Sequence, residues 1–174
     1  MARPPSDDDF TEMVHAAWPS LYRTAYLLLG DRAEAEDLVQ AALAKTYASW
    51  GKVRSLEAAP GYARTTLVNT ATAWFRRRSW RNERPTAELP EPAHIHVDDP
   101  TDRPAVIAAL GQLPPRQRAV VVLRYYDDLS VSQTATALGV STGTVKSQTS
   151  DALAKLRVLL GEDALPQTNG AHHD

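Results

Sequence analysis

The chain has 174 residues, with 19 Lys and Arg against 21 Asp and Glu, and it contains no cysteine. This length allows one domain or two small ones and excludes a large multi-domain enzyme. The lack of cysteine excludes a disulfide framework, a cysteine-ligated zinc ion and a thiol nucleophile. The N-terminus lacks the basic-then-apolar order of a signal peptide and no apolar run approaches ~18 residues, so we expect a cytoplasmic protein with no membrane association.

Residues 8–81 predict a small bundle of helices. Apolar residues recur there at three- and four-residue spacing, which is the period of one helix face. We expect Pro19 to start a new turn or kink the first helix, Gly30 to stop it and Asp31 to cap the second. The second helix is expected to end at Gly51, and Pro60 to begin the third. The expected core positions are Phe10, Met13, Val14, Ala17, Leu21, Ala25, Leu28, Ala35, Leu38, Val39, Ala42, Leu43, Thr46, Trp50, Ala63, Leu67, Ala71 and Trp74.

The rest of the chain predicts a linker, a second helical domain and a tail. Residues 82–104 hold five prolines and six acidic residues, with too few apolar groups to offset the entropy of ordering. We therefore expect a flexible, acidic, Pro-rich linker over residues 82–103. Four short helices follow over residues 104–160, and the polar tail over residues 161–174 is expected to be disordered. The fold class is all-α, with two small helical domains.

Residues 130–157 carry the signature of a helix-turn-helix. Two predicted helices are joined by a three-residue turn whose Gly139 can adopt a positive φ. Ala135 is expected at the close-packed position, and Val140 and Val145 are expected between the helices. The alternative is a plain helical hairpin inside a bundle. The side chains left outward are polar and short enough to enter a DNA major groove, namely Thr144, Lys146, Ser147, Gln148 and Ser150.

A second feature is the basic segment over residues 74–84, which interleaves five arginines with three aromatic residues. Arginine attracts phosphate, and aromatic rings offer flat faces on which unpaired bases stack. The alternative is a solvated helix end, since cations near a C-terminus also complement the helix dipole. Together with a helix-turn-helix, this segment indicates nucleic acid as the partner.

Four motifs occur in a characteristic order. They are Ala-Glu-Asp-Leu-Val-Gln at 35–40, Leu-Val-Asn at 67–69 before a Trp and arginines, Leu-Pro-Pro-Arg-Gln at 113–117, and Gly-Val-Ser-Thr-Gly-Thr-Val-Lys-Ser at 139–147. In this order, with a linker in the middle, the chain resembles the extracytoplasmic function (ECF) sigma factors, the minimal members of the sigma-70 family. The resemblance covers about residues 8–160.

The resemblance implies a role for each domain. The first domain, region 2, would dock on the clamp helices of the largest catalytic subunit of bacterial RNA polymerase and melt the promoter minus-10 element. Polymerase binding is then expected of Asp37, Leu38, Val39 and Gln40, although Ala41 stands where the family often has an acidic residue. Asn69 looks like the asparagine that receives a flipped base of the non-template strand; the alternative is an amide that caps backbone. The expected minus-10 contacts are Arg64, Asn69, Arg76, Arg77, Arg78, Trp80 and Arg81.

The second domain, region 4, would read the minus-35 element and touch the β flap. The residues that match the reading positions are Thr144, Lys146, Ser147 and Gln148. The family commonly has arginine at Gln148 and at Asp151, and usually Glu at Gln133. Asp151 has the wrong sign for phosphate. Either the promoter differs, or Asp151 is rotated away from DNA, or region 4 binds weakly and region 2 dominates.

Two other functions are compatible with these motifs. A helix-turn-helix regulator that acts without polymerase, and a sigma-like decoy that binds polymerase without reading promoters, stay as alternatives. An anti-sigma factor is a hypothesis from the family. No phosphate loop or nucleophile elbow occurs, so we expect no enzyme, no cofactor and no small-molecule substrate. We also expect no metal at His94, His96 and Asp98, which lie in the linker; the linker itself would thread toward the polymerase cleft or serve as a tether.

Overall fold

The computed structural model describes residues 5–80 and 104–161 of the chain. Within these ranges all regular structure is helical and no strand occurs, which confirms the all-α prediction. Contacts divide the chain into two compact units, Met1–Arg84 and Pro85–Asp174. None of the helices in the described ranges has the length and apolar character that crossing a bilayer requires.

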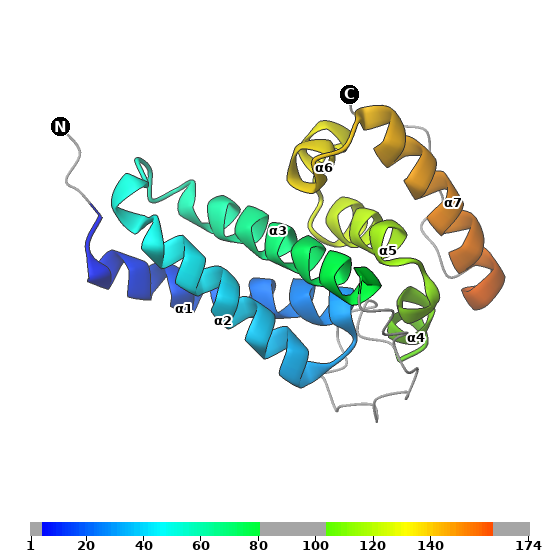
Figure 1. Ribbon diagram of the computed structural model, residues 1–174, viewed down its shortest axis with the longest axis horizontal. Coiled ribbons are helices and arrows are strands. Elements are labelled where there is room, and N and C mark those ends of the chain that lie inside the picture. Colours follow the sequence, from blue (N-terminus) through cyan, green and yellow to red (C-terminus); the bar gives the residue numbers. More distant parts are fainter. Residues whose placement is uncertain (1–4, 81–103, 162–174) are drawn as a thin grey trace. The chain divides into compact units, whose positions relative to one another are not determined.

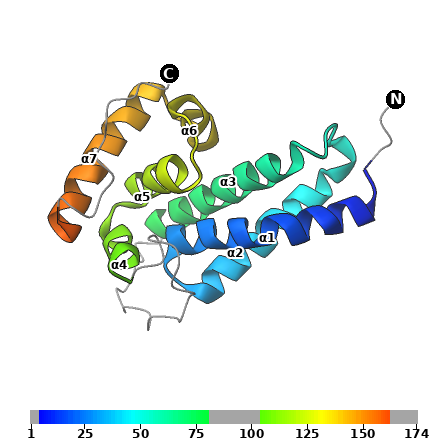
Figure 2. The ribbon, with the colours of Figure 1, turned by 180° about the vertical axis from the view of Figure 1, so that it is seen from behind.

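The first unit consists of three long helices that lie side by side (Figures 1 and 2). They are α1 (Asp7–Leu29), α2 (Arg32–Ala48) and α3 (Ala59–Trp80), with a short 3-10 turn, η1 (Trp50–Lys52), after α2. Each of the three packs against the other two. The periodic positions predicted for α2 are all buried, as are most of those predicted for α1 and α3. Phe10, Val14 and Trp74 are half-buried.

The predicted helix ends are largely confirmed. Gly30 has φ 72° and ends α1, and the Asp31 carboxylate accepts a hydrogen bond from the Glu34 amide at 2.9 Å. The expected new turn at Pro19 does not occur, because α1 continues through it. Pro19 is exposed, and burial of Ala17 and Leu21 on either side offsets the lost backbone hydrogen bond.

The second helix ends earlier than predicted, and the reason is a tether to the start of α1. Instead of continuing to Gly51, α2 stops at Ala48 and Trp50 turns inward, donating from Nε1 to the Ser6 carbonyl at 2.8 Å. The Phe10 ring packs against Tyr47 and Trp50, with centroids 4.9 and 5.0 Å away. This aromatic group ties the first turn of α1 to the end of α2.

The helices of the second unit are α4 (Pro104–Gln112), α5 (Pro115–Val121), the π-helical turn η3 (Val122–Tyr126), α6 (Val131–Leu138) and α7 (Thr142–Leu160). Among them, α7 packs against α4, α5 and α6 (Figures 1 and 2). Arg118 closes the end of α4: its guanidinium donates to the carbonyls of Leu110 at 2.7 Å, Gly111 at 3.0 Å and Leu113 at 3.1 Å. Burial lowers the pKa of Arg118 from its ordinary value.

The helix-turn-helix is formed by α6, the turn and α7. The Ser130 hydroxyl and the Gln133 side chain make a reciprocal capping box at the start of α6. Gly139 has φ 65° and ends α6, and the Ser141 hydroxyl caps α7 by accepting from the Thr144 amide. The core between the helices is a cluster of Val120, Ala135 and Val145, with Val140 packed against it. The predicted turn and wedge residues are therefore confirmed.

Candidate polymerase and nucleic-acid interfaces

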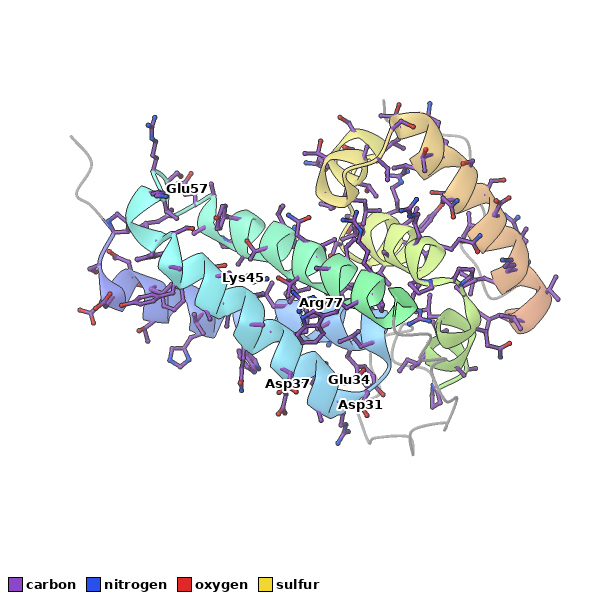
Figure 3. The ribbon with its side chains drawn as sticks, in the orientation of Figure 1. Asp31, Glu34, Asp37, Lys45, Glu57 and Arg77 are labelled. Carbon is purple, nitrogen blue, oxygen red and sulfur yellow. The ribbon has the colours of Figure 1, made fainter. Side chains whose placement is uncertain are left out.

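The predicted polymerase motif on α2 is divided between the surface and the core. Leu38 and Val39 are both 0% exposed, so they contact the other helices of the unit. Asp37 and Gln40 are exposed and, being three residues apart, share one face of α2. Figure 3 shows Asp37 on the edge of α2 that points away from α3. Only two of the four residues can therefore contact a partner directly in this fold.

Charge is segregated between two neighbouring helices. The N-terminal half of α2 carries three acidic residues, Glu34, Glu36 and Asp37, against one cation, Arg32. The 22 residues of α3 include four arginines and no Asp or Glu. An anionic polymer approaching this unit is therefore attracted to α3 and repelled from the first turns of α2.

The predicted minus-10 residues are only partly brought together. Asn69, Arg76 and Arg77 are exposed on α3. Arg64 is half-buried, already takes part in other interactions, and lies about 140° around the helix from Asn69, five residues away. Arg78 and Trp80 belong to the last turn of α3, but their side chains, like Arg81, lie outside the described part.

Lys45 is a cation at the seam between α2 and α3 that the sequence did not indicate. Its Nζ donates to Thr70 Oγ1 at 3.2 Å, which brings an ammonium group from α2 to the seam with α3, beside the residue that follows Asn69 (Figure 3). Thr70 is itself buried, and its hydroxyl donates to the Thr66 carbonyl at 2.7 Å. The helical period of α2 leaves Lys45 off the buried face, and only the packing of α2 on α3 shows that its neighbour is Thr70.

The predicted reading residues lie on the first two turns of α7. Lys146 and Ser147 are exposed, and Thr144 and Gln148 are half-buried. The Thr144 hydroxyl lies 2.9 Å from the Ser141 hydroxyl, so it forms part of the helix cap. Asp151 is exposed one turn beyond Ser147 and shares its face of the helix. The helix thus presents this carboxylate on the predicted reading face.

Lys146 also borders a basic groove on the other flank of α7. The groove has a volume of about 360 Å³ and is bounded by η3, the start of α6 and α7. Three cations and no carboxylate line it, and Arg157 follows Lys146 by 11 residues, three turns along the same face. Arg124 and Arg157 are not among the residues expected from the sequence to contact DNA. The lining residues are Arg124, Tyr125, Val131, Lys146, Thr149, Ser150, Leu153 and Arg157.

Metal binding finds no support in the described ranges, 5–80 and 104–161. No group of three or more His, Cys, Asp or Glu side chains with suitable spacing for a metal ion occurs there. His94, His96 and Asp98, with the whole linker over 82–103, lie outside the described residues. So does the tail from residue 162 onward.

The two units define a class of protein: an all-helical DNA-binding protein that combines a three-helix bundle, whose third helix is basic, with a helix-turn-helix. The family model "Sigma-70 region 2" matches residues 13–81, and "Sigma-70, region 4" matches residues 109–158. The chain therefore belongs to the sigma-70 family, in its ECF group of RNA polymerase sigma factors. Sigma factors bind core RNA polymerase and direct promoter-specific initiation, which is the function that this membership assigns to the chain.

Relatives and solved structures agree with this assignment. An RNA polymerase sigma-E factor of Streptomyces coelicolor is 42% identical over 150 residues, covering 86% of this chain and 84% of the relative. The ECF RNA polymerase sigma factor SigL of Mycobacterium tuberculosis is 35% identical over 158 residues and 85% of each chain. The sigma factor RpoE of Bartonella quintana, solved in complex with the anti-sigma factor NepR, is similar in structure, with a TM-score of 0.65, 25% identity, and coverage of 89% of this chain and 98% of that one.

Proposed function

We propose that this sigma factor uses α2 for core RNA polymerase and α3 and α7 for promoter DNA. In region 2, Asp37 and Gln40 contact the clamp helices of the largest polymerase subunit, while Leu38 and Val39 hold α2 in the bundle. The observation that carries the proposal is the difference in charge between the two helices, because the N-terminal half of α2 has an excess of acidic residues whereas α3 has four arginines and no carboxylate, which suits partners of opposite sign.

At the minus-10 element, Asn69 binds a base that leaves the stack of the non-template strand. The amide can donate to and accept from a base edge, and it is exposed on α3. Arg76 and Arg77 neutralise phosphates of the same strand. Arg78, Trp80 and Arg81 extend this set by their positions in the sequence, whereas the half-buried Arg64 contributes less.

At the minus-35 element, α7 enters the major groove with Lys146, Ser147 and Gln148 toward base edges, and Thr144 at the start of the helix faces the backbone. Lys146 and Arg157 border the basic groove, which supports a phosphate contact on that flank. Region 4 also touches the β flap of the polymerase. Asp151 opposes this binding, so region 2 contributes most of the promoter affinity.

The test is transcription in vitro from host promoter fragments, with core RNA polymerase and with or without this protein. We expect initiation at a discrete set of start sites only when the protein is present. Footprinting of DNA by the protein alone would favour a regulator that acts without polymerase. Polymerase binding without initiation would favour a decoy.

The variant Asn69→Ala distinguishes recognition of the minus-10 element from binding to core RNA polymerase. We expect unchanged polymerase binding and about tenfold fewer open complexes, since one specific base contact contributes roughly 1–3 kcal/mol. Gln112→Ala, which removes an exposed amide from the other unit, is the matched control. Open-complex formation equal to that of the unaltered protein would remove Asn69 from the mechanism.

An anti-sigma partner is a further part of the proposal. It rests on family membership and on the RpoE structure, which was solved with the anti-sigma factor NepR. Purification of the protein from its host should recover such a partner at a stoichiometric level. Recovery of polymerase subunits alone would count against it.

A further inference from the structure

The basic groove of the second unit has the size and the mixed lining of a small-ligand site. Its volume of about 360 Å³ falls within the range of about 300–1,000 Å³ that small-molecule sites occupy. Cations, an aromatic ring, hydroxyl groups and aliphatic side chains all line it. The π-helical turn η3 contributes Arg124 and Tyr125 to this lining, and single π-helical turns are frequently found at functional sites.

The groove lies on a different face of α7 from the predicted reading residues. Lys146 and Arg157 are eleven residues apart, close to three full turns, so both point toward the groove. Ser147 and Asp151 are turned by about 100° and 140° from Lys146, and neither lines the groove. An anion that enters the groove is therefore directed away from the Asp151 carboxylate.

The cations of the groove suit a ligand with several negative charges. No carboxylate lines the groove, so no acidic side chain there neutralises Arg124, Lys146 or Arg157. The Arg124 guanidinium is held in place, because its Nη1 donates to the Leu129 carbonyl at 2.6 Å. Lys146 and Arg157 begin about 16.5 Å apart along α7, so a ligand that meets both is longer than a single phosphate ion.

The groove also has an apolar part, which binding of phosphate alone does not require. Val131 and Leu153 contribute aliphatic surface. The side chain of Tyr125 is 38% exposed and makes no ring contact with any residue in the ranges 5–80 and 104–161. An exposed aromatic ring can stack on the face of a base, whereas the backbone of duplex DNA offers only phosphate and sugar. The lining therefore favours a ligand that joins a free base to phosphate.

We propose that the basic groove binds a nucleoside diphosphate: the Tyr125 ring stacks on the base, and the three cations neutralise the diphosphate, which carries about three negative charges at neutral pH. The site does not depend on the proposed promoter contacts. One consequence does rest on them, because Lys146 belongs both to the groove and to the proposed minus-35 surface. A bound nucleotide therefore weakens binding of minus-35 duplex DNA.

The experiment is isothermal titration calorimetry of the full chain, without DNA or polymerase, using ADP as the probe. Adenosine and pyrophosphate, which are the two halves of the ligand's chemistry, are titrated separately. The groove variants are Tyr125→Ala, Tyr125→Phe and Arg157→Gln. Because α3 of the other unit is also basic, two control variants outside the groove show where ADP binds. They are Tyr62→Ala, at an exposed tyrosine of α3, and Lys155→Gln, at an exposed cation of α7.

We expect ADP to bind with a Kd in the micromolar range, and adenosine and pyrophosphate to bind at least tenfold more weakly. Tyr125→Ala should weaken ADP binding about 5- to 100-fold, the range for loss of one stacked base, whereas Tyr125→Phe keeps the ring and should stay within about twofold. Arg157→Gln should weaken ADP binding about tenfold or more and leave adenosine binding unchanged. Neither control variant should change ADP binding.

Three results would overturn the inference. They are the absence of ADP binding at concentrations up to about 1 mM, ADP binding by Tyr125→Ala equal to that of the unaltered protein, and pyrophosphate binding as tight as that of ADP, which would show a general anion surface. Circular dichroism should confirm that every variant keeps its helical content, and Tyr125→Phe tests the ring with the smallest change.

Competition with DNA separates this inference from the proposed function. ADP at about ten times its Kd should weaken binding of minus-35 duplex DNA about tenfold. If ADP binds in the groove and the affinity for duplex DNA does not change, the nucleotide site is supported, and the minus-35 contact proposed for Lys146 is contradicted instead.

Discussion

At the scale of single residues, the four residues predicted to bind polymerase divide into two that are exposed, Asp37 and Gln40, and two that are buried in the bundle, Leu38 and Val39. Asp37→Lys reverses an exposed charge, so we expect a loss of polymerase binding of tenfold or more while the bundle stays folded, since interfacial charge reversal costs several kcal/mol. Glu36→Lys is the matched control, because it makes the same charge change at the preceding residue, which is also exposed but points in a different direction from the helix axis. Affinity for core polymerase and thermal unfolding should both be measured. Equal losses in the two variants would indicate a general electrostatic effect of α2.

Asp151 is the exposed carboxylate on α7 that opposes the minus-35 binding proposed above. It shares the exposed face of α7 with Ser147, so Asp151→Arg should raise the affinity of the full chain for minus-35 duplex DNA by about tenfold and steepen its dependence on salt by about one phosphate contact. Glu57→Arg, at an exposed carboxylate of the other unit (Figure 3), has the same charge change and should have little effect. Fluorescence anisotropy at several salt concentrations measures both quantities. A neutral or weakening effect would show that Asp151 does not face phosphate.

At the scale of elements, two glycines near the turn of the helix-turn-helix should respond in opposite ways. Gly139 has φ 65°, so Gly139→Ala should destabilise the second unit by about 1–2 kcal/mol. Gly143 lies in the first turn of α7, where an added Cβ would meet only Ser141 Oγ at 3.8 Å. Gly143→Ala should therefore stabilise the unit by about 0.5–1 kcal/mol. Thermal unfolding without DNA tests the pair, and a destabilised Gly143→Ala would contradict the helix assignment.

The pattern of residues along the sequence predicted the helices and the turn at Gly139 well, but it predicted the contacts between helices poorly. Every core position of α2 followed from its apolar period, and the turn at Gly139 followed from residue type, because both signals lie within a few residues of sequence. The π-helical turn η3 was not predicted. The early end of α2 was not predicted either, since it depends on Ser6, a partner distant in the chain. The contact of Lys45 with Thr70 and the basic groove were not predicted for the same reason, because both form only where helices pack against one another. The role of Asn69 was predicted from the family resemblance alone, and the fold shows that its side chain is exposed.

At the scale of the whole molecule, the two compact units should unfold separately. Arg118→Met removes three hydrogen bonds to the carbonyls at the end of α4, so it should destabilise the second unit by about 2–4 kcal/mol. Arg116→Met, at an exposed arginine of the same helix, is the control. Hydrogen exchange should become faster in α5, α6 and α7 and stay unchanged in α1, α2 and α3. Faster exchange throughout both units would show that they unfold as one.

The complete burial of Leu38 and Val39, between the two exposed residues proposed to bind polymerase, has a consequence for how this sequence can change. Packing in the bundle core constrains Leu38 and Val39, whereas under the proposal a partner constrains the exposed Asp37 and Gln40. If the surface of the polymerase drifts, compensating substitutions can appear at the second pair without disturbing the first. A lineage with an altered polymerase should therefore keep apolar residues at positions 38 and 39 and vary at positions 37 and 40.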